Sequence, residues 1–231
     1  MAIYACSDFH GHYDIYEKIK NYLKPEDKVI FLGDAADRGP NGWKLIKAIL
    51  ADPQWTYIKG NHDVMLYESV LGPDRYDAAR LHRYNGGKPT TDAMNQDTME
   101  EIYRVAKELR DCETMYIYIN KNANIIKMTH SGYTGLGTDD RIWDRTHYFH
   151  YIQPEEECDY IIHGHTPWFY IDEDLGKNTY KTEDQISEAT NGAYWYADDH
   201  KCCIDRCTII SKQAVLLDLD TFEEQIFTSA E

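Results

Sequence analysis

The chain has 231 residues, of which 42% are apolar, and it carries 24 basic against 40 acidic residues, a formal net charge of −16. This length and composition are typical of a globular α/β protein with a sizeable core. The negative charge argues against nucleic acid or an anionic membrane as a partner, because both need basic surfaces. A phosphorylated substrate stays compatible with it, because bound metal ions reverse the local field.

The beginning of the chain and its cysteines indicate a cytoplasmic protein. A strand is expected at residues 3–6, which leaves no room for a secretory leader. No apolar run reaches the roughly 18 residues of a membrane span. The six cysteines show no disulfide-like spacing, so we expect reduced thiols. Cys202, Cys203 and Cys207 could bind a soft metal, but their spacing is unlike that of common zinc sites.

The first 60 residues alternate between expected strands and helices. The strands are expected at residues 3–6, 29–32 and 55–58. Ile15, Ile19 and Leu23 follow helical spacing, and a second helix is expected between Pro40 and Pro53. This β-α-β-α-β order predicts a parallel sheet with right-handed crossovers.

The remainder of the chain predicts helices followed by strands. Residues 63–111 indicate mainly helices, and strands are expected at 115–119, 124–129, 159–163, 203–210 and 213–219. Residues 172–200 are polar and acidic, which favours an irregular excursion or flap on the surface. We therefore expect an α/β fold of two packed β-sheets flanked by helices, in one domain over residues 1–231.

Five of the expected strands end in polar motifs: DFHGH, GDAADRG, GNHD, KMTHSG and IIHGHT. Because the carboxyl ends of parallel strands share one edge, these motifs should converge. Each motif alone is most often turn chemistry, but their joint occurrence favours a metal site. The donors expected there are Asp8, His10, Asp34, Asn61, His130 and His165.

This donor set consists of oxygens and imidazoles without a thiolate, which suits Mn, Fe, Zn or Mg. Six donors exceed the needs of one tetrahedral ion but fit two ions that share a carboxylate, an arrangement known for phosphate hydrolysis. Asp34 follows a central strand and is the expected bridge. Asp37, three residues later, would then orient another group.

The motifs resemble the signature of the calcineurin-like metallophosphoesterases: D-x-H, G-D-x-x-D-R-G, G-N-H-[DE], and two further histidine segments, the last often G-H-T. The length and the segments YNGG (84–87) and WDR (143–145) are most similar to the small bacterial and phage-type (lambda-like) serine/threonine protein phosphatases. The resemblance implies a four-layer α/β/β/α sandwich.

The resemblance also implies roles for single residues. Asp8, His10 and Asp34 would hold one metal ion, and Asp34, Asn61, His130 and His165 the second. Two divalent ions are implied, with Mn favoured over Fe, Zn, Mg or Ni, and a hydroxide between them would attack phosphorus in line.

Other residues would act on the phosphate and the leaving group. Arg38 and Arg145, with Asn61, would bind the phosphate. His62, paired with Asp37, would protonate the leaving alkoxide. Asn85 either reaches the phosphate or belongs to a glycine-rich turn.

Some positions depart from the family pattern or have no motif. Asp63 stands where Glu is commoner, which leaves its contacts open. His163 is expected to support the site without binding metal, and His12 to shape the first loop. Solvated or structural roles are expected for the histidines outside the motifs, namely His82, His147, His150 and His200.

Three functions are consistent with the sequence. The leading expectation is a phosphomonoesterase for phosphoserine and phosphothreonine in proteins. The first alternative is a symmetrical bis(5′-nucleosyl)-tetraphosphatase or another nucleotide phosphohydrolase. The second is an inactive relative that only binds phosphoproteins, which the presence of all ligands and of the acid disfavours. The sequence does not indicate an oligomeric state.

Overall fold

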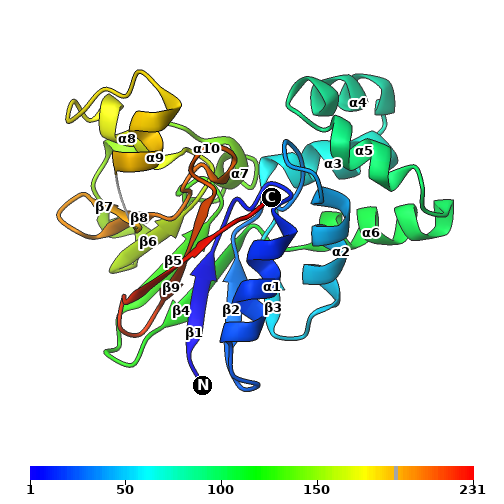
Figure 1. Cartoon of the computed structure of the whole chain (residues 1–231). Helices are drawn as coiled ribbons and strands as arrows, with labels where there is room; N and C mark the ends of the chain where they lie inside the picture. The colour runs from blue at the N-terminus through cyan, green and yellow to red at the C-terminus, as the bar shows by residue number, and fades with distance from the viewer. Residues whose placement is uncertain (190–191) are drawn as a thin grey trace.

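Two five-stranded β-sheets form the centre of the computed structural model, which describes residues 1–189 and 192–231 (Figure 1). The first sheet has the order β10-β9-β1-β2-β3. Its strands are β1 (Ile3–Cys6), β2 (Lys28–Phe31), β3 (Trp55–Tyr57), β9 (Gln213–Asp218) and β10 (Glu224–Thr228). The neighbours β1, β2 and β3 are parallel, which confirms the expected β-α-β-α-β unit, whereas β9 pairs with β1 in the antiparallel direction.

The second sheet has the order β4-β5-β6-β8-β7 and is also mixed. Its strands are β4 (Met115–Ile119), β5 (Ile125–Thr129), β6 (Tyr160–His163), β7 (Tyr194–Tyr196) and β8 (Lys201–Cys203). β5, β6 and β8 are parallel, so the loops that follow these three strands leave the sheet at one edge.

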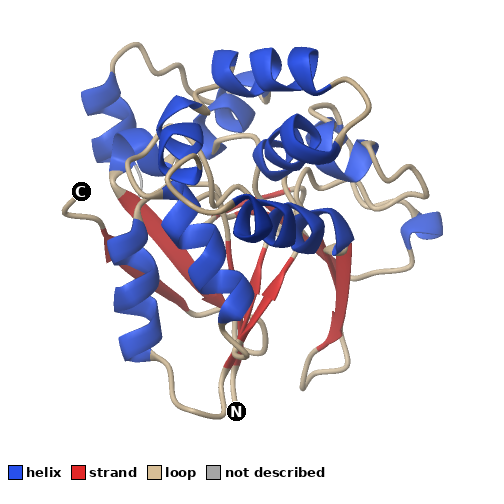
Figure 2. Cartoon of the chain, turned by 90° about the vertical axis from the view of Figure 1, so that its right-hand side faces the viewer, coloured by secondary structure: helices blue, strands red, loops and turns tan. Residues whose placement is uncertain are grey.

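Six helices lie between β1 and β4 in the chain. They are α1 (Tyr13–Tyr22), α2 (Gly42–Ala51), α3 (Asn61–Leu71), α4 (Arg75–Tyr84), α5 (Lys88–Met94) and α6 (Met99–Asp111). Asp74 and Thr98 cap α4 and α6, since their side chains accept the backbone N–H of Asp77 and Glu101. Figure 2 shows the side of the molecule on which these helices lie, with strands beside and behind them.

The alternation of strand residues separates two hydrophobic cores. Val29 and Phe31 of β2 face the helices and pack with Ile15 of α1 and Ile46 of α2. Ile30, between them, belongs to the core that joins the two sheets, together with members of the second sheet such as Ile126, Met128, Ile162 and Cys202. Since successive strand residues point to opposite faces, the apolar run at 29–32 fits a strand that is buried on both sides.

A third core covers part of the outer face of the second sheet. It joins α8 (Trp168–Asp174) and α9 (Glu183–Ala189) to β7 and β8 through Trp168, Ile186, Tyr196 and Cys203. The other short helices are α7 (Asp140–Trp143), α10 (Thr208–Ser211) and the 3₁₀ turns η1 (His147–Phe149) and η2 (Pro154–Glu156). Helices thus flank both sheets, as expected.

The structure corrects the expectation for residues 172–200. This segment contains the end of α8, all of α9 and strand β7, so it is not irregular throughout. Asp172 organises it as a buried carboxylate that accepts hydrogen bonds from Asn178, Tyr180 and Tyr194 at 2.7–2.9 Å. Residues 190 and 191 of this segment lie outside the described residues.

The expected strand at 203–210 is also wrong. β8 ends at Cys203, and α10 begins at Thr208. Between them Asp205 accepts the backbone N–H of Cys207 at 2.7 Å, and Cys207 has a φ of 53°, so the chain turns where the β-branched residues after it suggested a strand. Strand β10 was missed because its exposed residues give little apolar signal. No helix among the described residues is long and apolar enough to cross a membrane.

Candidate metal centre

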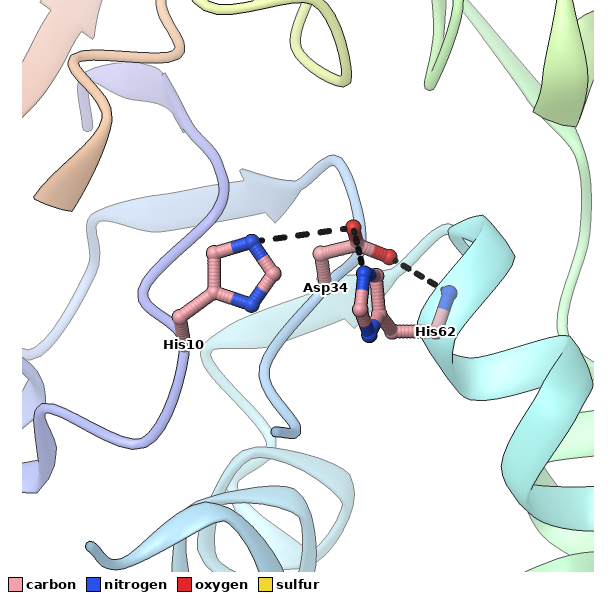
Figure 3. Close-up of side chains that lie close together, drawn as sticks. All are labelled: His10, Asp34 and His62. Carbon is pink, nitrogen blue, oxygen red and sulfur yellow. Dashed lines mark hydrogen bonds and ion pairs between the residues drawn. The ribbon is translucent and has the colours of Figure 1, made fainter. Parts of the chain in front are cut away.

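The loops after five strands bring the predicted ligands together. Asp8 and His10 follow β1, Asp34 follows β2, and Asn61 begins α3 directly after β3. His130 and His165 follow β5 and β6. All six side chains are buried. Figure 3 shows His10 and His62 on either side of the Asp34 carboxylate.

The backbone of these loops is strained. Six residues at the site have a φ between 42° and 71°, a region that residues other than glycine rarely adopt: Asp8, His10, Asp34, Asp37, Arg38 and His165. Hydrogen bonds between the first two loops hold this conformation, from the N–H of Asp8 to Gly33 O and from the N–H of His10 to Asp34 O, each 3.0 Å. Such strain is typical of functional sites.

Gly33 allows the second and third loops to approach each other. A Cβ at this position would lie 2.4 Å from the backbone nitrogen of Gly60, and its φ is 92°. Asp63 ties the same loops together, because one carboxylate oxygen accepts the N–H of Asp34 at 3.0 Å and of Gly60 at 2.8 Å. Its other oxygen accepts the hydroxyl of Tyr57 at 2.8 Å. Asp63 therefore fixes the backbone of Asp34.

Asp34 lies between two sets of donors. His10 Nε2 is 3.9 Å from one Asp34 oxygen and 4.0 Å from Asp8 Oδ1. His130 Nε2 is 3.4 Å from the other Asp34 oxygen. Two candidate metal-binding groups, one of His10, Asp34 and His62 and one of Asp8, Asp34 and His130, share this carboxylate.

Asn61 joins the remaining predicted ligands. Its Oδ1 lies 3.0 Å from His130 Nε2 and 3.0 Å from His165 Nδ1. The backbone N–H of His165 contacts Asp8 Oδ2 at 3.2 Å. The structure therefore brings all six predicted ligands into one cluster.

The residues of this cluster fit divalent metal ions. Asp8 Oδ1 and His165 Nε2 are buried and have no hydrogen-bond partner among the described residues. Buried polar atoms are normally paired, so two such atoms in a cluster of carboxylates and imidazoles indicate that the cluster accommodates cations as their partners.

The charges of the cluster reinforce this interpretation. Burial and then the neighbouring Asp205 raise the pKa of Asp8 well above its usual value. Burial acts against ionisation of Asp34 as well, but His130 and His62 hold the pKa of Asp34 well below its usual value. Burial disfavours a charged His130, yet the facing Asp34 raises the pKa of His130 to about 9. A metal ion would take the place of this proton, since ligand imidazoles must be neutral.

Comparison with known proteins identifies the family of the chain. The model of the calcineurin-like phosphoesterase family matches residues 1–182. The chain belongs to the calcineurin-like phosphoesterases. Members of this family are hydrolases that generally use divalent metals.

Two curated relatives match short parts of this phosphoesterase. Serine/threonine-protein phosphatase 2 of Escherichia coli (strain K12) is 34% identical over 70 residues, which are 29% of this chain and 32% of the relative. A symmetrical bis(5′-nucleosyl)-tetraphosphatase of Delftia acidovorans is 29% identical over 79 residues, 32% of this chain and 28% of the relative. The matches thus span about a third of each relative.

A solved structure shares the fold over nearly the whole phosphoesterase. A crystal structure of a putative diadenosine tetraphosphatase superimposes with a TM-score of 0.60 at 13% identity, and covers 98% of this chain and 93% of that chain. At this identity the likeness concerns the fold alone.

The arginines of the phosphoesterase lie at the rim of the cluster. The Arg38 guanidinium contacts His10 Nε2 and His62 Nε2, each at 2.9 Å. Burial and Arg38 lower the pKa of His10 well below its usual value. Arg145 is exposed, and its Nη1 lies 3.4 Å from Thr166 Oγ1. Asn85, in contrast, directly follows α4, and its side-chain amide donates to the Leu81 carbonyl at 2.9 Å, a contact that agrees with the turn alternative.

A cleft of about 510 Å³ extends from these arginines. Arg38, Arg145 and His165 line one part of it, and the rest includes the aromatic side chains Tyr148, Phe169 and Tyr170. Tyr148 is held by a hydrogen bond from its hydroxyl to Asp174. The cleft therefore combines cations for an anionic group with aromatic surface for an adjoining one.

His62 and Asp37 are paired as expected, at 2.7 Å between Nδ1 and Oδ2. The other Asp37 oxygen contacts His82 Nε2 at 2.8 Å, a partner that the sequence did not indicate. Although burial opposes ionisation, these two histidines lower the pKa of Asp37. His82 lies on α4, outside the strand-end motifs, so no local pattern could have revealed it.

Asp205 is a second residue that the sequence analysis missed. It is buried directly after β8, and burial raises its pKa to about 6. Like Asp8 and Asp34, Asp205 is an acid shortly after the end of a strand. We did not identify it from the sequence because it lay inside the strand wrongly expected at 203–210.

His163, His12, Cys202 and Cys203 have contacts that fit structural roles. His163 is buried and its Nε2 lies 2.7 Å from the Tyr196 hydroxyl, while burial lowers its pKa to about 3. His12 Nδ1 contacts the Phe9 carbonyl at 2.9 Å in the first loop. Cys202 and Cys203 belong to different cores, on opposite faces of β8, which argues against a common metal site.

Proposed function

We propose that the protein is a two-metal phosphomonoesterase that hydrolyses phosphoserine and phosphothreonine in proteins. The observation that carries the proposal is the carboxylate of Asp34, whose two oxygens face His10 at 3.9 Å and His130 at 3.4 Å, next to the His62–Asp37 pair. A shared carboxylate and a separate proton donor are what metal-assisted cleavage of a phosphate ester with a poor leaving group requires.

In this proposal each group of residues has one task. Asp8, His10 and Asp34 would hold one ion, and Asp34, Asn61, His130 and His165 the other, with Mn favoured over Fe, Zn, Mg or Ni. When bound, such ions supply an activated water and neutralise the charge of the phosphate. Arg38 and Arg145 bind phosphate oxygens, since guanidinium groups match their geometry.

His62 supplies the proton to the leaving oxygen. An ionised carboxylate only accepts hydrogen bonds, so Asp37 fixes a hydrogen on His62 Nδ1. The other nitrogen, Nε2, lies 2.9 Å from Arg38 and 4.0 Å from Asp34, at the rim where the phosphate would bind. The donor is the doubly protonated imidazolium: Asp37 keeps the Nδ1 hydrogen, and the Nε2 hydrogen passes to the serine or threonine oxygen as its bond to phosphorus breaks, which leaves His62 neutral. The Arg38 guanidinium only donates, so it must turn from Nε2 to the phosphate before this step, which contributes ~10²–10⁴-fold to the rate.

The aromatic cleft favours a second candidate, a phosphohydrolase for dinucleoside polyphosphates. Tyr148, Phe169 and Tyr170 offer faces on which a nucleobase can stack next to the two arginines. The similarity to a tetraphosphatase of Delftia acidovorans is compatible with this candidate.

A substrate panel tests the proposal. Purified protein loaded with Mn²⁺ would be given a phosphoserine peptide and diadenosine tetraphosphate, with Asp34→Asn and His62→Asn as inactive controls. We expect a higher kcat/KM for the peptide. Faster cleavage of the dinucleotide would favour the second candidate, and a wild-type protein without activity on either would indicate a binding protein.

We place the protein in a reducing compartment such as the cytoplasm, because its six cysteines are free thiols.

A further inference from the structure

Asp37 is held by three helices. His62, in the first turn of α3, contacts its Oδ2 at 2.7 Å, and His82, near the end of α4, contacts its Oδ1 at 2.8 Å. The hydroxyl of Thr90 on α5 accepts its backbone N–H at 2.9 Å. Asp37, His62 and His82 are each at most 2% exposed, so water does not compete for these contacts.

The two imidazoles bind one acceptor. The Asp37 carboxylate has no hydrogen to give, so His62 Nδ1 and His82 Nε2 must each donate one. If His82 were absent, Oδ1 would lose its partner in a buried position, and a free carboxylate oxygen there would compete for the His62 hydrogen.

The surroundings of His82 are built around its ring. A Cβ at Gly87 would lie 2.5 Å from the ring atoms Cδ2 and Nε2, so only glycine leaves room for the imidazole. The N–H of Gly87 also donates to the His82 carbonyl at 2.9 Å. Thr91 Oγ1 lies 3.5 Å from the second ring nitrogen, Nδ1.

The backbone of Asp37 needs such support. Its φ of 71° lies in the left-handed region, where a residue other than glycine persists only if its surroundings hold it. The neighbouring Arg38 has a φ of 65°, and its N–H donates to the Gly86 carbonyl at 2.9 Å. The segment from His82 to Gly87 thus contacts both Asp37 and Arg38.

We propose that His82 is a positioning residue of the active site. It binds Oδ1 of Asp37, so that Oδ2 holds the Nδ1 hydrogen of His62 and the His62 imidazolium presents its Nε2 hydrogen to the leaving group. The YNGG segment (84–87) serves the same purpose by making room for the His82 ring. This inference rests on the proposed role of His62 as the general acid. His82 acts through Asp37 on His62, the proton donor. A poor leaving group needs this proton most, so His82 should contribute most to the rate with such substrates.

Leaving-group dependence tests the clamp. The variants are His82→Leu, which removes the donor, and His82→Gln, whose amide N–H can replace Nε2–H; Arg83→Gln, an exposed neighbour on α4, is the matched control. We expect His82→Leu to lower kcat about 10- to 100-fold on a phosphoserine peptide, as supporting residues at metal sites commonly do. On 4-nitrophenyl phosphate, whose leaving group needs no acid, we expect a decrease below about 3-fold.

Rescue and metal binding separate positioning from general damage. His82→Gln should restore most of the activity on the peptide, and the Mn²⁺ affinity and KM of both variants should equal those of the wild type. Equal losses on both substrates, or no loss on the peptide, would overturn the proposal. If the wild-type protein cleaves neither ester, the proposed function fails.

NMR of the metal-free protein tests the clamp without any turnover. The ¹H spectrum should show two strongly deshielded imidazole N–H signals, assigned with His62→Gln and His82→Gln. His82→Leu should remove one signal and shift that of His62. A His62 signal that does not respond would contradict the coupling, even in an enzyme that is active.

Discussion

Replacement of Asp34 and of Asp37, the two acids of GDAADRG, by asparagine should affect different properties of the enzyme. Asp34→Asn removes the charge that His10 and His130 face at 3.9 and 3.4 Å. Loss of this shared ligand should weaken Mn²⁺ binding at least as much as loss of a supporting residue does, roughly 10- to 100-fold. We also expect fewer than two ions to bind.

Asp37→Asn should instead leave metal binding intact and slow turnover. An asparagine offers one carbonyl oxygen to two imidazole donors, at present 2.7 and 2.8 Å from the carboxylate oxygens. One buried donor then lacks an acceptor, which costs about 1–3 kcal/mol. If this cost falls on the transition state, kcat decreases about 5- to 160-fold, since about 1.36 kcal/mol corresponds to tenfold.

Calorimetric titration with Mn²⁺ and steady-state kinetics on a phosphoserine peptide separate the two outcomes. The reasoning would be refuted if Asp37→Asn weakened Mn²⁺ binding as much as Asp34→Asn does. It would also be refuted if Asp34→Asn bound two ions with the wild-type affinity.

Three further predictions concern stability and metal dependence. Burial opposes ionisation of Glu156, but hydrogen bonds, first of all with His147, lower the pKa of Glu156 to about 2. The Glu156 charge therefore stabilises the fold fully above about pH 4.5, and this stabilisation is lost as the pH falls towards 2. Urea unfolding should show Glu156→Gln about 1–2 kcal/mol less stable at pH 7 and nearly equal to the wild type near pH 2, and a pH-independent difference would contradict the assignment. Gly87→Ala should displace the His82 ring, lower the free energy of unfolding by about 1–3 kcal/mol and reduce turnover of the peptide. An unchanged melting temperature and an unchanged kcat would show instead that the His82 ring has room for the added methyl group. Removal of divalent ions with a chelator should abolish hydrolysis and lower the melting temperature, and Mn²⁺ at 100 times its Kd should restore about 2.7 kcal/mol; activity that survives chelation would exclude a metal centre.

The ligand cluster could be predicted because each donor stands directly after a strand. Asp8 and Asp34 follow parallel neighbours of the first sheet, so strand pairing places them at one edge. His130 follows β5 of the second sheet, and the packing of the two sheets brings it to Asp34. The partner of Asp37 could not be predicted in this way. His82 reaches Asp37 because α4 packs against α3. Helix packing does not place a contact residue at a fixed distance along the sequence, so no motif near Asp37 indicates His82.

Local propensity also misled where tertiary contacts decide. Thr208, Ile209 and Ile210 are good strand formers, yet the turn at Asp205 and Cys207 makes them helical. We expected residues 172–200 to be irregular because the sequence suggests that their acidic residues are exposed. Asp172 is instead buried and accepts three hydrogen bonds.

The position of β1 between β2 and β9 has a consequence for how the chain acquires its fold. β1 pairs with β2 early in the sequence, but its other edge pairs Tyr4 with Asp218, almost the full length of the chain away. During synthesis, β1 therefore remains an unprotected edge strand until residues 213–228 leave the ribosome. The closing contact is the costliest in loop entropy, so it should form late. We therefore expect nascent chains that stop before residue 213 to expose an unpaired apolar edge and to aggregate more readily than the full chain.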